Sequence, residues 1–146
     1  MKLRPPTDTL AGCVWLPRFV DKVRHHLAST LEPDFVRPFC HPLATDGAFL
    51  SHFSLEKDEI IEVVRASNGD DGAVERWFLS RPQHTQEKIS AWNQLGPNIG
   101  KEGFPVRHGF LWVIKHYYGG VAPDPRVDSA FTAIAFDEGY LDDLRQ

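Results

Sequence analysis

Apolar side chains recur along residues 16–31 at the spacing of a single helix face. This stripe consists of Leu16, Val20, Val23, Leu27 and Leu31. The i, i+4, i+7, i+11 spacing predicts an amphipathic helix, with Leu27 at the centre of its buried face. Pro17 suits the first turn, where no backbone N–H is needed. The opposite face carries Arg18, Asp21, Lys22, His25 and Ser29. We interpret it either as a solvated charged surface or as the lining of a binding surface.

Shorter stripes with the same period predict further helices along the rest of the chain. A short helix is expected over 47–53, and Ser54 is expected to cap a helix over about 55–66. The remaining stripes are Val74, Trp77, Phe78; Ile89, Trp92, Leu95; Val106, Phe110, Val113, Ile114, Tyr117; and Val127, Phe131, Ile134, Ala135. Each stripe is three to five residues, so the predicted helices are short.

Capping residues give the expected starts of three of these helices. Asp70 or Asp71 is expected to cap one helix and Thr85 the next, because their side chains can accept from free backbone N–H groups. Asp124 followed by Pro125 is interpreted as an N-cap and the first position of the final helix.

Strand signals are scarce, and two segments are expected to be mainly extended or turned. Residues 1–13 are expected to form an extended lead-in, because Pro5-Pro6 and Gly12 interrupt regular structure. Three prolines make the tract 32–42 largely extended or turned. The sequence therefore predicts an all-α, compact single domain over 1–146, a bundle of about six or seven short helices with little or no sheet.

Length, charge and cysteine content narrow the class of protein. The chain has 146 residues, enough for one core, and a net charge of −4, so we expect no binding to nucleic acid or membrane. Residues 1–6 begin no apolar run, and the longest run, 110–114, is too short to span a bilayer. Two cysteines make no disulfide scaffold, and a cytoplasmic location is expected.

The opening segment also resembles a known family. The matching residues are Gly12-x-x-x-Leu16-Pro17-Arg18-x-x-Asp21-Lys22-x-Arg24-x-His26-Leu27. This pattern is similar to the opening signature of a bacterial family catalogued as domain of unknown function 5069. Later matches are the helix ending near Trp77, the segment Ile89-x-Ala91-Trp92-Asn93 and the closing Phe136-Asp137-x-x-Gly139. The resemblance implies a helical, single-domain, intracellular bacterial protein and brings no catalytic residues.

Metal, cofactor and thiol chemistry find little support in the residue spacing. Seven histidines include no His-x-x-x-His or Glu-x-x-His pair, and His25 and His26 diverge by about 100° on a helix. No metal and no cofactor is therefore expected, although a site assembled from Cys40, His41 and His52 stays open. A Cys40-His41 nucleophile is disfavoured because adjacent residues rarely hold the required geometry.

Two hypotheses of function remain. The first is a non-enzymatic binding or interaction module for an unknown small molecule or protein. Its candidate binding residues are Arg18, Asp21, Lys22, His25, His26 and Asn93. The alternative is a small enzyme in which Arg18 holds an anionic substrate while His26 and Asp21 move protons. Convergence of these three side chains in a concave pocket would favour the enzyme. Trp112, off the main stripe of its helix, is the best candidate for an exposed interface aromatic.

Overall fold

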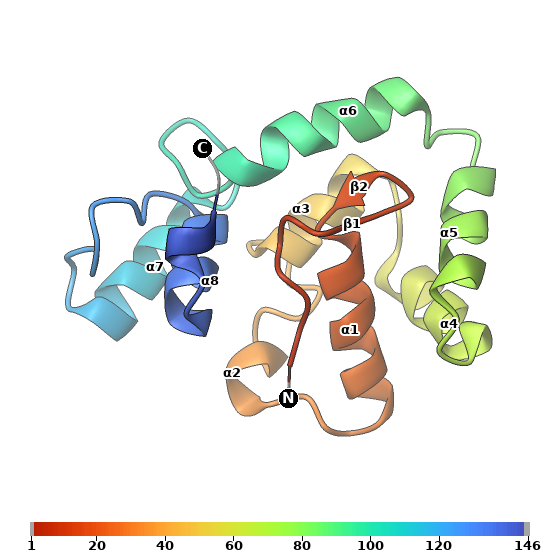
Figure 1. Cartoon of the computed structure of the whole chain (residues 1–146), viewed down its shortest axis with the longest axis horizontal. Helices are drawn as coiled ribbons and strands as arrows, with labels where there is room; N and C mark the ends of the chain where they lie inside the picture. Colours follow the sequence, from red (N-terminus) through yellow and green to blue (C-terminus); the bar gives the residue numbers. More distant parts are fainter. Residues whose placement is uncertain (1, 145–146) are drawn as a thin grey trace.

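The computed structural model describes residues 2–144 and confirms the mostly helical single domain (Figure 1). Within that range there are eight α-helices, two 3₁₀ turns and one two-stranded ladder. The helices are α1 (Leu16–Leu27), α2 (Pro33–Val36), α3 (Thr45–His52), α4 (Lys57–Ser67), α5 (Asp71–Ser80), α6 (Gln86–Leu95), α7 (Arg107–Tyr118) and α8 (Ala130–Glu138). The 3₁₀ turns are η1 (Gly96–Asn98) and η2 (Leu141–Asp143).

The segment expected to be an extended lead-in contains a small hairpin. Strands β1 (Thr9–Leu10) and β2 (Cys13–Val14) pair antiparallel. Ala11 and Gly12 connect them, both with positive φ, the conformation that tight two-residue hairpin turns require. The strands are too short to give an alternating pattern, which explains why the sequence did not reveal them.

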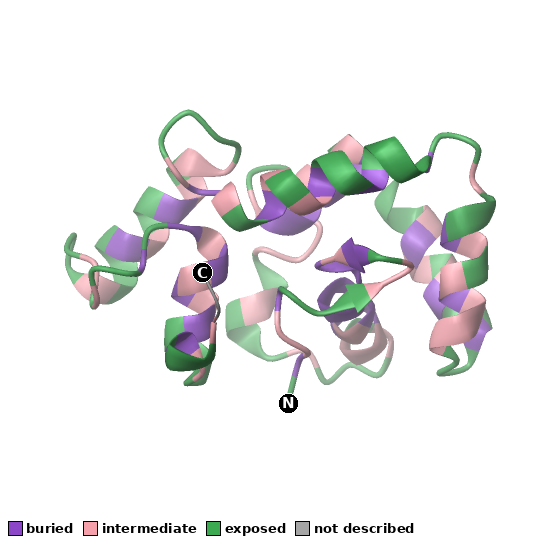
Figure 2. Cartoon of the chain, turned by 45° about the horizontal axis from the view of Figure 1, so that its top comes forward, coloured by how far each residue is buried: buried purple, intermediate pink, exposed green. Residues whose placement is uncertain are grey.

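Helix α1 lies at the centre of the main hydrophobic core, surrounded by α3, α4 and the hairpin (Figure 1). Phe19, Val20 and Val23 on α1 are fully buried. An aromatic cluster continues the core from α3 to α6, where the ring of Phe49 lies 5.2 Å from that of Trp92. Figure 2 shows the buried faces of the helices turned inward. The expected apolar stripe of α1 is thus confirmed over its first two turns.

A second, smaller apolar cluster joins α7 to α8 and the chain end. Its buried members are Phe110, Ile114, Val127, Ala133, Ala135 and Leu141. Because this cluster involves one side of α7, the other side of that helix is left at the surface (Figure 2).

The expected caps are partly confirmed. Asp70 accepts from the N–H of Gly72, and Thr85 caps α6. Ser54 is not a cap: it has a φ of 53°, and α4 begins after Glu56, which forms a capping box.

The prediction for the last helix start is wrong, and the tract after Glu32, expected to be largely extended or turned, also contains the four-residue helix α2. The Asp124 carboxylate accepts from the backbone and guanidinium of Arg126 and so closes a turn, whereas α8 begins after Ser129. Pro33 occupies the first turn of α2, a position where proline is tolerated, so a short helix forms in the proline-rich tract. No helix among residues 2–144 is long and apolar enough to cross a membrane.

Candidate functional site

Two cations on the polar face of α1 are buried, which corrects the first of the two interpretations, that of a solvated charged surface. Arg18 is 1% exposed and Lys22 4% exposed, whereas Leu27, expected at the centre of the core, is only half-buried. The helical period was right, but α1 is enclosed on more than one side. Each buried cation has a carboxylate partner from a distant segment, which offsets the cost of its desolvation.

Lys22 is paired with Asp46 in the first turn of α3. Its Nζ lies 2.6 Å from Asp46 Oδ2 and 5.1 Å from the centre of the Trp15 ring. Asp46 also accepts from Trp15 Nε1 at 2.9 Å and from the Cys40 N–H at 3.1 Å. Burial lowers the pKa of Lys22, and the neighbouring Asp46 opposes that shift. The ammonium is thus a component of a buried polar centre.

Arg18 links α1 to the end of α8. Its Nη1 and Nη2 donate to the two carboxylate oxygens of Glu138 at 3.0 and 2.6 Å, a bidentate arrangement. Nη1 also donates to the Arg4 carbonyl, and the guanidinium lies 5.8 Å from the centre of the Phe35 ring. Arg18 therefore fixes the position of Glu138 against the N-terminal segment, by which we mean residues 2–8, before β1.

Asp21 belongs to a separate ion-pair network. It accepts from the backbone N–H of Arg4 at 2.8 Å and from its guanidinium at 2.9 Å. Arg4 and Arg24 both contact Asp71, at 2.7 and 2.8 Å. This network ties the N-terminal segment and α1 to the start of α5.

The remaining candidate residues also have local partners. His25 Nδ1 lies 2.7 Å from the hydroxyl of Thr30, and the exposed His26 packs on the ring of Phe39. Asn93 on α6 binds the hairpin by accepting from the Val14 N–H at 3.0 Å and donating to the Gly12 carbonyl at 2.8 Å. Arg18 and Asp21 both contact Arg4, whereas His26 contacts Phe39, so the three side chains do not share one partner.

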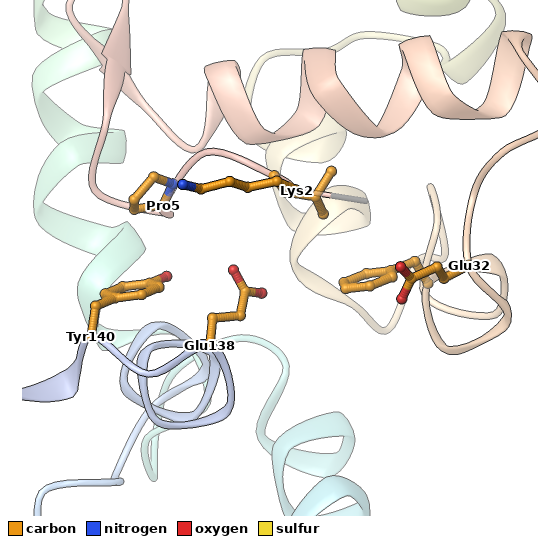
Figure 3. Close-up of a pocket in the computed structure, with 7 residues that line it drawn as sticks. Lys2, Pro5, Glu32, Glu138 and Tyr140 are labelled. Carbon is orange, nitrogen blue, oxygen red and sulfur yellow. The ribbon is translucent and has the colours of Figure 1, made fainter.

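A cavity of about 360 Å³ lies beside the Arg18–Glu138 pair. It is lined by Lys2, Leu3, Pro5, Glu32, Phe35, Glu138 and Tyr140 (Figure 3). The N-terminal segment forms one wall, the residues around α2 a second, and the end of α8 a third. Figure 3 shows the Lys2 ammonium and the Tyr140 hydroxyl toward the Pro5 end and the Glu32 carboxylate toward the other.

Tyr140 is the least satisfied polar group of this cavity. Its hydroxyl oxygen is covered but has no hydrogen-bond partner among the described residues. Burial, together with the charge of Glu138, raises the pKa of Tyr140, so the hydroxyl stays protonated and available as a donor. A buried polar group without a partner is costly in a folded protein.

The sequence did not reveal this cavity, because its walls come from both ends of the chain. Gly139 ends α8 with a φ of 83°, and Tyr140 then donates its backbone N–H to the Ala135 carbonyl. This left-handed cap turns Tyr140 back along the helix. The closing match Phe136-Asp137-x-x-Gly139 of the sequence pattern ends at this cap, one residue before Tyr140.

Thiol chemistry is disfavoured by the surroundings of both cysteines. Burial raises the pKa of Cys40 to about 12 and that of Cys13 further still, so neither is a ready thiolate. The Nδ1 of His41 accepts from the Leu43 N–H at 3.0 Å and so is not free to act as a base toward Cys40. Among residues 2–144 no group of three or more His, Cys, Asp or Glu side chains is placed to hold a metal ion. The absence of a bound metal stays a prediction.

Comparison with known proteins supplies a family and no activity. No curated protein matches the chain. The family model described as Domain of unknown function (DUF5069) matches residues 1–139, which is nearly the whole chain. The protein therefore belongs to the DUF5069 family, a domain of unknown function.

Proposed function

We propose that this protein is a non-enzymatic binding module that holds a small polar organic molecule in the cavity between its N-terminal segment, α2 and the end of α8. The observation that carries the proposal is the covered Tyr140 hydroxyl without a partner in the cavity wall. A ligand that accepts a hydrogen bond there would remove the penalty of leaving this group unsatisfied.

The cavity offers polar groups of both kinds beside apolar walls. Lys2 and Tyr140 are donors, whereas Glu138 can accept further hydrogen bonds beyond those from Arg18. Leu3 and Phe35 provide apolar surface. A volume of about 360 Å³ suits a metabolite-sized molecule. Arg18 contributes by holding Glu138 rather than by contacting the ligand.

The enzyme alternative has less support. It requires Arg18, Asp21 and His26 around one substrate, but Arg18 is ion-paired with Glu138, Asp21 with Arg4, and His26 packs on Phe39. No histidine is among the residues that line the cavity, which weakens a proton-transfer role there. We further propose a location in the bacterial cytoplasm, supported by the two free cysteines.

The proposal is tested by a thermal-shift screen of free amino acids, small carboxylic acids and amines, followed by calorimetric titration of any compound that raises Tm. Phe35→Trp should fill the cavity and abolish binding. The substitution keeps an aromatic ring beside Arg18, so the contact of Phe35 with the guanidinium is preserved. Tyr140→Phe should weaken binding about three- to tenfold through one lost hydrogen bond. The unliganded Tyr140→Phe variant should be at least as stable as wild type, because the unpaired hydroxyl is gone.

Matched controls lie outside the cavity. Phe104→Trp and Tyr117→Phe make the same chemical changes at exposed positions and should bind as wild type. The proposal fails if no compound raises Tm. It also fails if Phe35→Trp and Tyr140→Phe bind the compounds as tightly as wild type, because the cavity is then not the binding site.

A further inference from the structure

The outward side of α7 exposes a group of large side chains, which we call the α7 outer face. Its residues are His108, Leu111, Trp112, Lys115, His116 and Tyr117. Leu111, Trp112 and Tyr117 are 44%, 39% and 52% exposed, while Phe110 and Ile114 on the opposite side pack into the second cluster. Helix α7 lies at the edge of the molecule, away from the main core (Figure 1). The exposure expected for Trp112 is confirmed.

The aromatic residues of the α7 outer face form an ordered cluster. The His116 ring stacks on Trp112 with centroids 4.5 Å apart, and Tyr117 meets Trp112 edge-on at 6.0 Å. Arg37, which follows α2, places its guanidinium 4.7 Å from the centre of the Trp112 ring. Trp, Tyr and Arg are the residues that contribute most to protein–protein interfaces, and rings held in place in the free protein lose less entropy on binding.

The charge of this surface is opposite to that of the whole chain. Residues 107–118 include no acidic residue, whereas the chain has a net charge of −4. Neither Arg37 nor Lys115 forms an ion pair with a carboxylate among residues 2–144. The described arginines that do form ion pairs are Arg4, Arg18, Arg24, Arg65, Arg76, Arg81 and Arg126.

The chemistry of Arg37 indicates what this surface binds. A guanidinium held beside an indole ring without a carboxylate partner keeps N–H groups that match the two oxygens of a carboxylate. We infer that the α7 outer face and Arg37 form a docking surface for an acidic segment of a partner protein. Carboxylates of that segment bind Arg37 and Lys115, and its apolar side chains pack on Leu111 and Trp112.

A single-stranded nucleic acid fits this surface less well. Base stacking needs an accessible aromatic ring face, and the Trp112 ring is already engaged by His116 and Arg37.

The inference is tested by fluorescence anisotropy with the whole protein and a short labelled helical peptide made of Glu, Ala and a stripe of Leu. Wild type should bind this peptide and should bind neither a version with Lys in place of Glu nor one with Ala in place of Leu. Arg37→Gln should weaken binding about tenfold, since a charge-assisted bidentate contact is lost. Trp112→Ala should weaken it at least as much.

The control is Arg76→Gln, which removes the same charge from an exposed position on α5 and should leave binding unchanged. The inference is overturned if the Glu peptide does not bind, if the Lys peptide binds equally, or if Arg37→Gln and Trp112→Ala bind as wild type. Two further results would overturn it: a preference for labelled oligouridylate, or a concentration-dependent dimer that Trp112→Ala abolishes, since the occupant would then be a nucleic acid or a second copy.

Discussion

Replacing Lys22 by Met tests the buried ion pair between α1 and α3. Met keeps the length of the side chain and removes its charge, so Asp46 is left as a buried anion without its cation. Removing one partner of a buried pair typically costs about 3–5 kcal/mol of unfolding free energy. Asp46 keeps two donors, the Trp15 indole N–H and the Cys40 backbone N–H, which places the expected loss near the lower limit, about 3 kcal/mol.

The loss of unfolding free energy in Lys22→Met is measured by urea unfolding, followed by circular dichroism. In a chain of this size a loss of about 3 kcal/mol corresponds to a fall in Tm of about 10 °C. The double variant Lys22→Met/Asp46→Asn should lose about 2 kcal/mol less unfolding free energy than the two single variants lose in sum, because the neutral amide does not need a cation. Lys57→Met, at an exposed position at the start of α4, should cost under about 0.5 kcal/mol.

A Lys22→Met variant within about 1 kcal/mol of wild type would refute this reasoning. It would mean that the Nζ of Lys22 reaches water and that the face of α1 opposite its apolar stripe is solvated after all.

Two further outcomes follow from the surroundings of α3. Gly47→Ala should be strongly destabilising, by more than about 2 kcal/mol in urea unfolding, because a Cβ there would lie 2.2 Å from the carbonyl oxygen of His41; a variant as stable as wild type would show that this backbone approach is not as close. Cys40 should react with iodoacetamide at pH 8 at least about tenfold more slowly in the folded than in the urea-unfolded protein, because burial raises its pKa from 9.0 to about 12. The folded protein holds the Cys40 thiol proton more tightly than the unfolded chain does. The thiol's contribution to the free energy of unfolding is therefore complete below about pH 9 and declines as the pH rises toward 12.

The helices and part of their caps could be predicted because these signals are local. The apolar stripe of α1 and the caps Asp70 and Thr85 depend on residues within a few positions of each other. The predicted start of α8 is too early, because Asp124 and Ser129 are both capable caps and the sequence alone does not rank them. In the structure Asp124 closes a turn with Arg126, and Ser129 caps the helix.

The burial of Arg18 and Lys22 could not be predicted, because their partners Glu138 and Asp46 are distant in sequence. A charged side chain on a helix is usually solvated, and only the folded chain shows that a carboxylate meets it. The cavity was missed for a related reason. Tyr140 shares the cavity with the N-terminal segment and with Glu32 and Phe35, and no local pattern in the sequence joins these segments.

These contacts explain why the opening pattern shared with the family contains so many charged residues. Its charged members Arg18, Asp21, Lys22 and Arg24 bind four carboxylates or guanidinium groups that come from the N-terminal segment, α3, α5 and α8. Because one helix supplies all four contacts, the pattern specifies how the other segments assemble around α1 rather than a reacting centre. A role in binding then belongs to groups that the assembly leaves without a partner. Two candidates of this kind in the described part of the chain are the Tyr140 hydroxyl in the cavity, which has no hydrogen-bond partner, and the Arg37 guanidinium beside Trp112, which forms no ion pair. Neither residue belongs to the opening pattern.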